Sequence, residues 1–310
     1  MRVFKSIKIF LNKNFSIHFD VKNGRAFLRH QFFIKSISIF LSMKILIIGG
    51  GNMGLTYAQS FLRSHITNKS KLSFLERSEE RAAYLRSLDL GQVFSEPEDC
   101  LSQADLIILA VKPQDSAALF ARIRQHAGGG SQLFLSIMAG VPIRSISEQL
   151  NAAKVVRAMP NLPAQVSEGM TVFTATNDVT RLELVMVQNL LSTTGKTLYV
   201  ERESAIDAST AISGSGPAYV YYFMRAMMEA AQNMGFSQSE AELLVTQTFT
   251  GAVDLYNKTA FSCDEWIGRV ASKGGTTEAA LAAFEAADLH QKIMLGANAA
   301  LDRAVELGKK

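Results

Sequence analysis

A glycine-rich stretch contains the first residues whose spacing suits a chemical role. Gly49, Gly51 and Gly54 follow the pattern G-x-G-x-x-G between an apolar β-branched run, residues 44–48, and a helical pattern that begins near residue 55. In that context the first glycine permits a tight turn, the second lets a pyrophosphate approach the backbone, and the third lets helix and strand pack closely. The helix N-terminus then offers N–H donors to phosphates. The pattern predicts dinucleotide binding; a glycine turn without a ligand is the alternative.

The residues after the next apolar run, 71–75, lie where an adenosine ribose would be recognised. Glu76 is suited to accept hydrogen bonds from a 2′-hydroxyl, which favours NAD. Arg77 and Ser78 are suited to a 2′-phosphate, which favours NADP. A solvated turn with Ser78 as the N-cap of the following helix is the structural alternative, and it is compatible with either cofactor. NAD and NADP both stay open.

A second candidate site lies late in the chain, where the sequence VASKGGTT (residues 270–277) precedes Glu278 and an Ala/Leu-rich helix. The two glycines expose backbone N–H groups, and Thr276 and Thr277 carry hydroxyls. A helix N-terminus with free N–H groups suits a substrate carboxylate. An ordinary N-cap formed by Thr276 or Thr277 would explain the same residues without a ligand.

Alternating strand and helix patterns must position the first loop. Further strands are predicted at residues 106–111, 133–136, 154–157, 170–173 and 196–200, with helices between several of them, including one at 181–191. This alternation predicts a doubly wound parallel sheet with right-handed crossovers. Its carboxyl-end loops, 110–113, 136–140 and 159–161, are expected to surround the nicotinamide. Lys112 alone fits a solvated strand end equally well.

From about Glu203 the strand pattern stops, and helices are predicted at residues 218–234, 239–256, 277–288 and 290–307. Ser213-Gly-Ser-Gly-Pro217 is a glycine-rich entry to the first of them, and Gly235 suits its end. This first helix is apolar over most of its circumference and must be buried nearly all round. Intercalation of helices from two chains would bury it; an unusually apolar monomer core is the alternative.

Composition limits the class of protein. With 310 residues, 48% hydrophobic and 19% charged, the chain predicts about two globular domains and excludes a disordered or fibrous protein. Two cysteines, Cys100 and Cys263, exclude a disulfide scaffold and favour a cytoplasmic protein. Five scattered histidines indicate no metal site. No apolar run approaches the roughly 18 residues of a membrane helix.

Charge separates residues 1–42 from the rest. These residues carry eight basic side chains and one acid, Asp20, so their net charge is +7. Because the whole chain has a net charge of +4, the remaining residues carry −3. A mildly acidic body gives no electrostatic footprint for nucleic acid. The basic segment fits a transit peptide or a membrane-surface helix. It also fits an extension that is disordered or not native, which we favour because Met43 opens a complete first strand.

The motifs together resemble one family. They are GGGNMG (49–54), LAVKPQ (109–114), SIMAG (136–140), RAMPNLPAQVSEGMT (157–171), SGSGPAY (213–219) and SKGGTTEA (272–279). In this order they are similar to Δ1-pyrroline-5-carboxylate reductase, and the resemblance covers residues 43–310. It implies an α/β fold with an N-terminal Rossmann-type domain, 43–202, followed by an all-α dimerisation and substrate-binding domain, 203–310. It also implies NAD(P)H-dependent reduction of a cyclic imine to L-proline, the last step of proline synthesis, in a homodimer or larger assembly.

The resemblance implies site residues as well. Ser272, Gly275, Thr276 and Thr277 would hold the substrate carboxylate, with Thr277 facing the substrate nitrogen and Ser272 as the second catalytic candidate. The family slightly favours NADPH, whereas Glu76 argues for NAD. The expected cofactor-binding residues are Gly49, Gly51, Asn52, Met53, Gly54, Glu76, Arg77, Ser78, Ala110, Val111, Lys112, Pro113, Met138, Ala139 and Gly140.

Three residues depart from the family pattern, and two alternative functions stay open. Lys273 replaces the usual proline, Leu162 replaces a small polar residue, and residues 258–261 lack a glutamate. A catalytically weak NAD(P)-binding paralogue would tolerate these changes, although Thr276 and Thr277 argue against it. A β-hydroxyacid dehydrogenase shares the domain plan but needs a lysine early in the helical domain, and the first lysine there is Lys258.

Overall fold

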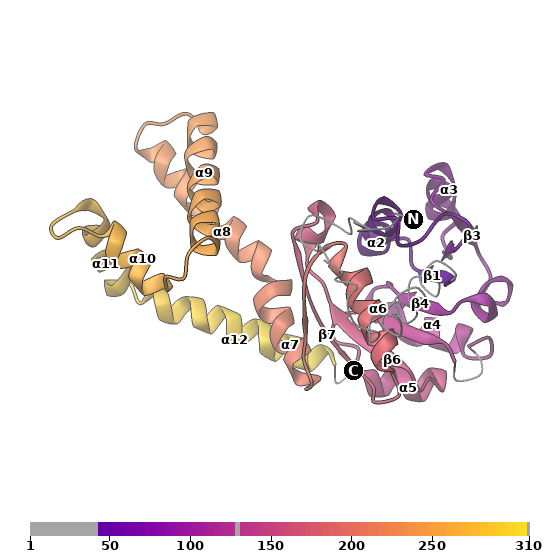
Figure 1. Cartoon of the computed structure of the whole chain (residues 1–310). Coiled ribbons are helices and arrows are strands. Elements are labelled where there is room, and N and C mark those ends of the chain that lie inside the picture. Colours follow the sequence, from indigo (N-terminus) through magenta and orange to yellow (C-terminus); the bar gives the residue numbers. More distant parts are fainter. Residues whose placement is uncertain (1–42, 128–130, 309–310) are drawn as a thin grey trace, which may run out of the picture. The chain divides into compact units, whose positions relative to one another are not determined.

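We describe residues 43–127 and 131–308 in a computed structural model of the chain (Figure 1). The expectations for residues 1–42 lie outside the described residues. Residues 44–310 form one compact unit, so the division into two domains near residue 202 stays a prediction. For clarity, we call residues 43–202 the sheet region and residues 203–310 the helical region.

The sheet region contains an eight-stranded sheet with the order β3-β2-β1-β4-β5-β6-β7-β8. Its strands are β1 (Ile45–Ile48), β2 (Leu72–Leu75), β3 (Gln92–Phe94), β4 (Leu106–Leu109), β5 (Leu133–Ser136), β6 (Val155–Met159), β7 (Gly169–Ala175) and β8 (Gly195–Tyr199). The short strand β3 was not predicted. The parallel sheet is confirmed except at one pair, because β6 and β7 run antiparallel. A parallel crossover needs a dozen or more residues, and the segment around the short turn η4 (Leu162–Val166) does not supply them.

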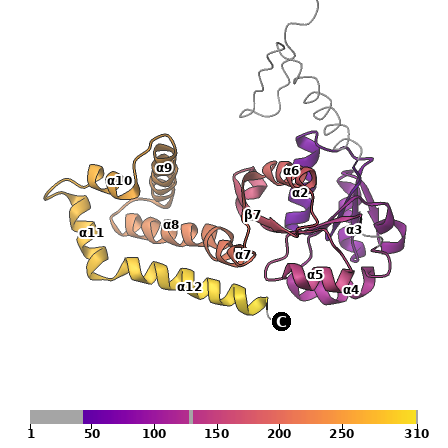
Figure 2. The ribbon, with the colours of Figure 1, turned by 60° about the horizontal axis from the view of Figure 1, so that its bottom comes forward.

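Five α-helices pack on the two faces of this sheet. They are α2 (Asn52–Arg63), α3 (Glu79–Ser87), α4 (Ser116–Ile123), α5 (Ile143–Leu150) and α6 (Arg181–Ser192). Helices α4 and α5 lie together on one side, and α2 and α6 lie on the other (Figure 2). Every residue of β1, β4 and β5 is buried, which is why these strands are continuous apolar runs rather than alternating ones.

The helical region contains only helices and turns among its described residues. These are α7 (Ser204–Ser209), the π-helical turn η5 (Thr210–Gly214), α8 (Gly216–Asn233), α9 (Gln238–Asn257), α10 (Cys263–Val270), α11 (Thr276–Ala286) and α12 (Leu289–Leu307). The four predicted helices are confirmed, and Gly235 takes the expected left-handed conformation after α8, with φ +101°. Helices α7 and α10 and the π turn were not predicted.

The side chains of α8 are not covered within one chain. None of its residues is buried, and its large apolar residues Val220, Tyr221, Tyr222 and Met227 are 43–64% exposed. The alternative of an apolar monomer core is therefore wrong for this helix. Within the described ranges, we find no helix with the length and hydropathy required to cross a membrane.

Candidate active site

The glycine-rich loop after β1 leaves room for side chains at one position only. Gly49 has φ +101°, and a Cβ there would lie 2.8 Å from the carbonyl oxygen of Ala110. A Cβ on Gly54 would lie 2.2 Å from the carbonyl oxygen of Gly49. At Gly51, the N-cap of α2, a Cβ would meet nothing within 4 Å, and no side chain caps the helix. This open, uncapped helix start fits a pyrophosphate.

The register of the sheet brings three predicted cofactor segments to one edge. Ile48 pairs with Leu109, and Leu109 pairs with Ser136, so the strands β1, β4 and β5 end at the same level. The segments that follow are the glycine-rich loop, residues 110–113 and residues 137–140. They are tied to the neighbouring strands by backbone bonds, such as the 2.9 Å bond from the Ala110 N–H to the Ile48 carbonyl oxygen.

Glu76 holds the glycine-rich loop in place. One carboxylate oxygen accepts a 2.9 Å hydrogen bond from the Gly50 N–H, and the other accepts a 3.0 Å bond from the Ser78 N–H. Arg81, on the first turn of α3, donates from Nε to the Gly50 carbonyl oxygen at 2.6 Å. Both backbone groups of Gly50, its N–H and its carbonyl oxygen, are thus held by side chains. The role of Arg81 was missed, because an arginine early in a solvated helix carries no distinguishing sequence signal.

Arg77 and Ser78 differ in how far they are engaged. The Ser78 hydroxyl accepts a 3.3 Å bond from the Arg81 N–H, so the predicted N-cap of α3 is confirmed. The Arg77 guanidinium makes a 2.9 Å ion pair with Asp115 and is 67% exposed. Since Asp115 follows the exposed Lys112 by three residues, this pair brings the end of β2 beside the segment after β4. Arg77, paired with a carboxylate, therefore lies at the ribose end of the expected cofactor site.

The second candidate loop forms an uncapped helix start. Gly275 is the N-cap of α11, and no side chain caps it. Thr276 and Thr277 are the first two residues inside the helix, so the alternative that either threonine is the N-cap is wrong. The loop is closed by a 2.9 Å bond from the Gly275 N–H to the Ser272 carbonyl oxygen. A Cβ on Gly275 would come within 2.5 Å of the Ser272 hydroxyl.

The prediction that the two glycines of this loop expose their N–H groups is wrong. The Gly275 N–H bonds to Ser272, and Gly274, which takes φ +71°, donates its N–H to the Glu278 carboxylate at 2.6 Å. Among the described residues, the hydroxyls of Ser272 and Thr277 have no hydrogen-bond partner, and Lys273 is exposed. No hydrogen bond or ion pair within the described ranges joins this loop to the glycine-rich loop. We call residues 272–277 the helix-start loop.

Two known families match separate segments of the chain. Residues 203–307 match the family of pyrroline-5-carboxylate reductase dimerisation domains. Residues 44–140 match the family described as NADP oxidoreductase, coenzyme F420-dependent.

Individual relatives extend over nearly the whole described chain. Pyrroline-5-carboxylate reductase 2 of Bacillus subtilis (strain 168) is 32% identical over 257 residues, which cover 81% of this chain and 90% of that protein. The pyrroline-5-carboxylate reductase of Corynebacterium melassecola is 34% identical over 268 residues, or 86% and 98% of the two chains. The solved pyrroline-5-carboxylate reductase of Coxiella burnetii superposes with a TM-score of 0.79 at 30% identity, covering 87% of this chain and all of that one. The Plasmodium falciparum enzyme, solved with NADP bound, gives a TM-score of 0.77 at 27% identity, covering 86% and 98%.

Proposed function

The chain belongs to the pyrroline-5-carboxylate reductase family, and from this premise we propose that it reduces Δ1-pyrroline-5-carboxylate to L-proline with a nicotinamide dinucleotide. One observation supports the substrate most directly: the helix-start loop offers an uncapped helix terminus with unpaired hydroxyls beside it. A cyclic imine acid needs such a site for its carboxylate and its ring nitrogen.

The helix-start loop binds the carboxylate through backbone groups. Among the described residues, the N–H groups of Thr276 and Thr277 have no partner, and they point along the axis of α11 toward its N-terminus, where the helix dipole favours an anion. The Ser272 hydroxyl lies against Gly275 and adds a donor at the edge of the same site. These donors orient the ring without a metal ligand.

Thr277 acts on the reacting end of the substrate. A bound nicotinamide cofactor supplies the hydride that the imine carbon accepts. The Thr277 hydroxyl makes a hydrogen bond with the ring nitrogen, whose character changes from iminium to amine in the reaction. Since a protonated iminium is already electrophilic, the residues of this chain contribute chiefly by aligning the two reactants, which can supply a large part of the rate.

We propose that NADP is the preferred cofactor. Both oxygens of the Glu76 carboxylate already accept backbone N–H bonds, so Glu76 is committed to the glycine-rich loop. Arg77 is held by an exposed ion pair with Asp115, and such pairs contribute only about 0–1 kcal/mol, so a 2′-phosphate can displace Asp115. The hydroxyl of Ser78 and the exposed Lys112 complete a cationic, hydrogen-bonding surface for that phosphate.

A pair of variants tests this cofactor preference. Arg77→Ala should raise the KM for NADPH about tenfold and that for NADH about twofold at most. Arg86→Ala is the matched control and should leave both constants unchanged, because Arg86 lies at the far end of the following helix α3 and pairs with Glu79 at 2.7 Å. An equal effect of Arg77→Ala on the two cofactors would overturn the assignment of Arg77 to the phosphate.

We propose further that the assembly is a homodimer or larger and that it works in the cytoplasm. The family of residues 203–307 is a dimerisation domain, and the exposed apolar side chains of α8 need a covering surface. Cys100 and Cys263 are free thiols. Free thiols are typical of proteins in a reducing compartment such as the cytoplasm.

The activity itself is tested by steady-state kinetics with purified protein. We expect oxidation of NADPH that depends on pyrroline-5-carboxylate and yields an equal amount of proline. A β-hydroxyacid should give no reaction in the reverse direction with NADP⁺. Binding of NADPH without turnover of pyrroline-5-carboxylate would leave the chain as a binding paralogue and would refute the proposal.

A further inference from the structure

We propose that Arg157 is a positioning residue that couples the helical region to residues 138–143, beside the expected nicotinamide site. The inference rests on the proposed function, because its consequence is the alignment of two bound reactants. Arg157 lies on β6 and is 2% exposed, and within the described ranges its side-chain hydrogen bonds and ion pairs go to Glu203 and Asp207 and not to either candidate loop.

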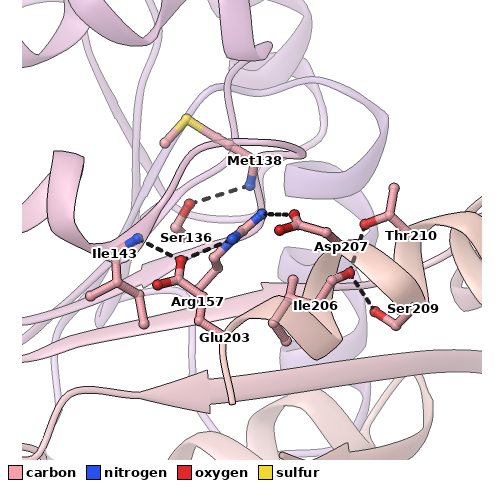
Figure 3. Close-up of polar contacts among 9 residues, drawn as sticks. All are labelled: Ser136, Met138, Ile143, Arg157, Glu203, Ile206, Asp207, Ser209 and Thr210. Atoms are coloured by element: carbon pink, nitrogen blue, oxygen red, sulfur yellow. Dashed lines mark hydrogen bonds and ion pairs between the residues drawn. The ribbon is translucent and has the colours of Figure 1, made fainter. Parts of the chain in front are cut away.

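The guanidinium of Arg157 joins two acids of the helical region. Nη1 donates to Glu203 at 2.8 Å, and Nη2 donates to Asp207 at 2.6 Å (Figure 3). Glu203 directly precedes α7, and Asp207 lies within it. The Glu203 and Asp207 side chains are 34% and 20% exposed, whereas that of Arg157 is 3% exposed. One buried cation thus holds the first helix of the helical region to the sheet.

The same network reaches the cofactor side of the sheet. The Glu203 oxygen bound to Arg157 also accepts the Ile143 N–H at 2.8 Å (Figure 3). Ile143 is the first residue of α5, whose N-cap, Pro142, supplies no side-chain cap. A carboxylate from the helical region therefore caps this helix, where a negative charge is favoured.

Two further contacts place residues 136–140 within the network. Ser136 is the register partner of Arg157 across β5 and β6, and its hydroxyl accepts the Met138 N–H at 3.3 Å. Gly140 has φ +71°, and a Cβ there would lie 2.9 Å from the Cβ of Leu307 in α12. Residues 138–143, three of which are expected to contact the cofactor, are thus shaped by both ends of the helical region.

A second bond from the same strand end supports this arrangement. The Asn161 side-chain amide donates to the Ser213 carbonyl oxygen at 3.0 Å, and its oxygen accepts the Met170 N–H at 2.8 Å. Ser213 lies in the π turn η5, a type of distortion that is frequent at functional sites. Asn161 follows Arg157 by four residues, so β6 and the turn after it bind the helical region at two points.

The energetics favour a role in alignment. Burying a charge is costly, and buried ion pairs often contribute less to stability than apolar residues of the same size. Arg157 carries a further cost, because its Nε is buried without a partner among the described residues. The network does, however, fix directions at three elements at once. Hydride transfer needs accurately placed reactants, since misplacing the reacting atoms by about 1 Å can lower the rate about a hundredfold.

Three variants test the inference in the full-length chain. Arg157→Lys keeps the charge but loses the two-armed bridge between Glu203 and Asp207. We expect its kcat to fall at least tenfold, with the Kd for NADPH within threefold of wild type. With NADPH deuterated at the transferred position, the isotope effect on kcat should rise, because a misaligned hydride transfer becomes slower than product release. Glu203→Ala should behave in the same way, whereas Glu203→Gln keeps an acceptor for Ile143 and should retain most of the activity.

Arg144→Lys is the matched control. Arg144 pairs with Glu148 on the same helix α5 and is 86% exposed, so this variant should match wild type in every measurement. A lower melting temperature with unchanged kcat and isotope effect in Arg157→Lys would overturn the inference and leave Arg157 purely structural. If Arg157→Lys does not fold, the contrast between Glu203→Ala and Glu203→Gln decides, and equal kcat values for those two would overturn it. If the wild-type protein does not reduce pyrroline-5-carboxylate, the proposed function is refuted instead. This result is distinct from the two outcomes that would overturn the role of Arg157.

Discussion

Thr277 is the second residue of α11, and because Gly275 is the N-cap, its hydroxyl is free for the substrate. Thr277→Val keeps the shape and removes the hydroxyl. We expect kcat to fall one to two orders of magnitude, since one lost hydrogen bond costs about 1–3 kcal/mol. The melting temperature should change little. Steady-state rates and melting temperature are measured on the same preparation.

Thr246→Val is the control for this substitution. The Thr246 hydroxyl bonds back to the Glu242 carbonyl oxygen at 2.6 Å within α9 and has no part in the helix-start loop. It should leave kcat unchanged. Normal turnover in Thr277→Val would contradict the assignment of Thr277 to the substrate nitrogen.

At the scale of elements, two glycines at the start of α2 should differ in their effect on stability, although both should affect cofactor binding. Gly51→Ala places a methyl group in open space, so the melting temperature should stay close to wild type, but the methyl group occupies the space expected for pyrophosphate. The Kd for NADPH should rise at least tenfold. Gly54→Ala places a Cβ 2.2 Å from the Gly49 carbonyl oxygen and should lower both stability and cofactor affinity. Tight NADPH binding by Gly51→Ala would show that the cofactor does not approach this backbone.

Helix α6 gives a prediction about acid stability. Burial opposes the ionisation of Glu183, but hydrogen bonds from Lys154, at 2.7 Å, and from Thr180 outweigh it and lower the pKa below its ordinary 4.5. A carboxyl whose pKa is lowered by folding stabilises the native state above the unfolded-state pKa, and this stabilisation is lost as the pH falls through the folded-state pKa. Glu183→Gln should therefore destabilise the protein at pH 7 and progressively less below pH 4.5.

Denaturant unfolding between pH 3 and 7 measures this effect, with Glu148→Gln, at an exposed position, as the control. If the free energy of unfolding of Glu183→Gln differs from that of wild type by the same amount across this range, the coupling is contradicted.

The elements also show how far the sequence predicts the structure. Long apolar runs such as residues 44–48 and 133–136 predicted their strands, because buried parallel strands need continuous apolar side chains. The parallel direction predicted for β7 was wrong, since the direction of a strand depends on the length of the preceding connection and not on the strand's own residues. The helix-start loop was predicted from its glycines and hydroxyls. The ion pairs of Arg157 were not, because they join residues 46 and 50 positions apart.

At the scale of the whole molecule, the exposed side chains of α8 predict assembly. Tyr221 is 59% exposed and lies among other apolar residues of this helix. Tyr221→Glu introduces a charge on that surface, so sedimentation at micromolar concentration should show dissociation toward monomers, while the wild type remains a dimer or larger. Asn177→Glu, in an exposed turn of the sheet region, should assemble normally. A wild-type monomer would contradict the proposed assembly.

The central claim concerns one transferred hydride, and isotope transfer tests it most directly. The protein is incubated with pyrroline-5-carboxylate and NADPH stereospecifically deuterated at C4 of the nicotinamide, and the product is analysed by mass spectrometry and NMR. Our account predicts that one of the two C4 diastereomers yields proline with one deuterium at the former imine carbon, in amounts equal to the NADP⁺ formed. Oxidation of NADPH without deuterated proline from either diastereomer, or no oxidation at all, would contradict it.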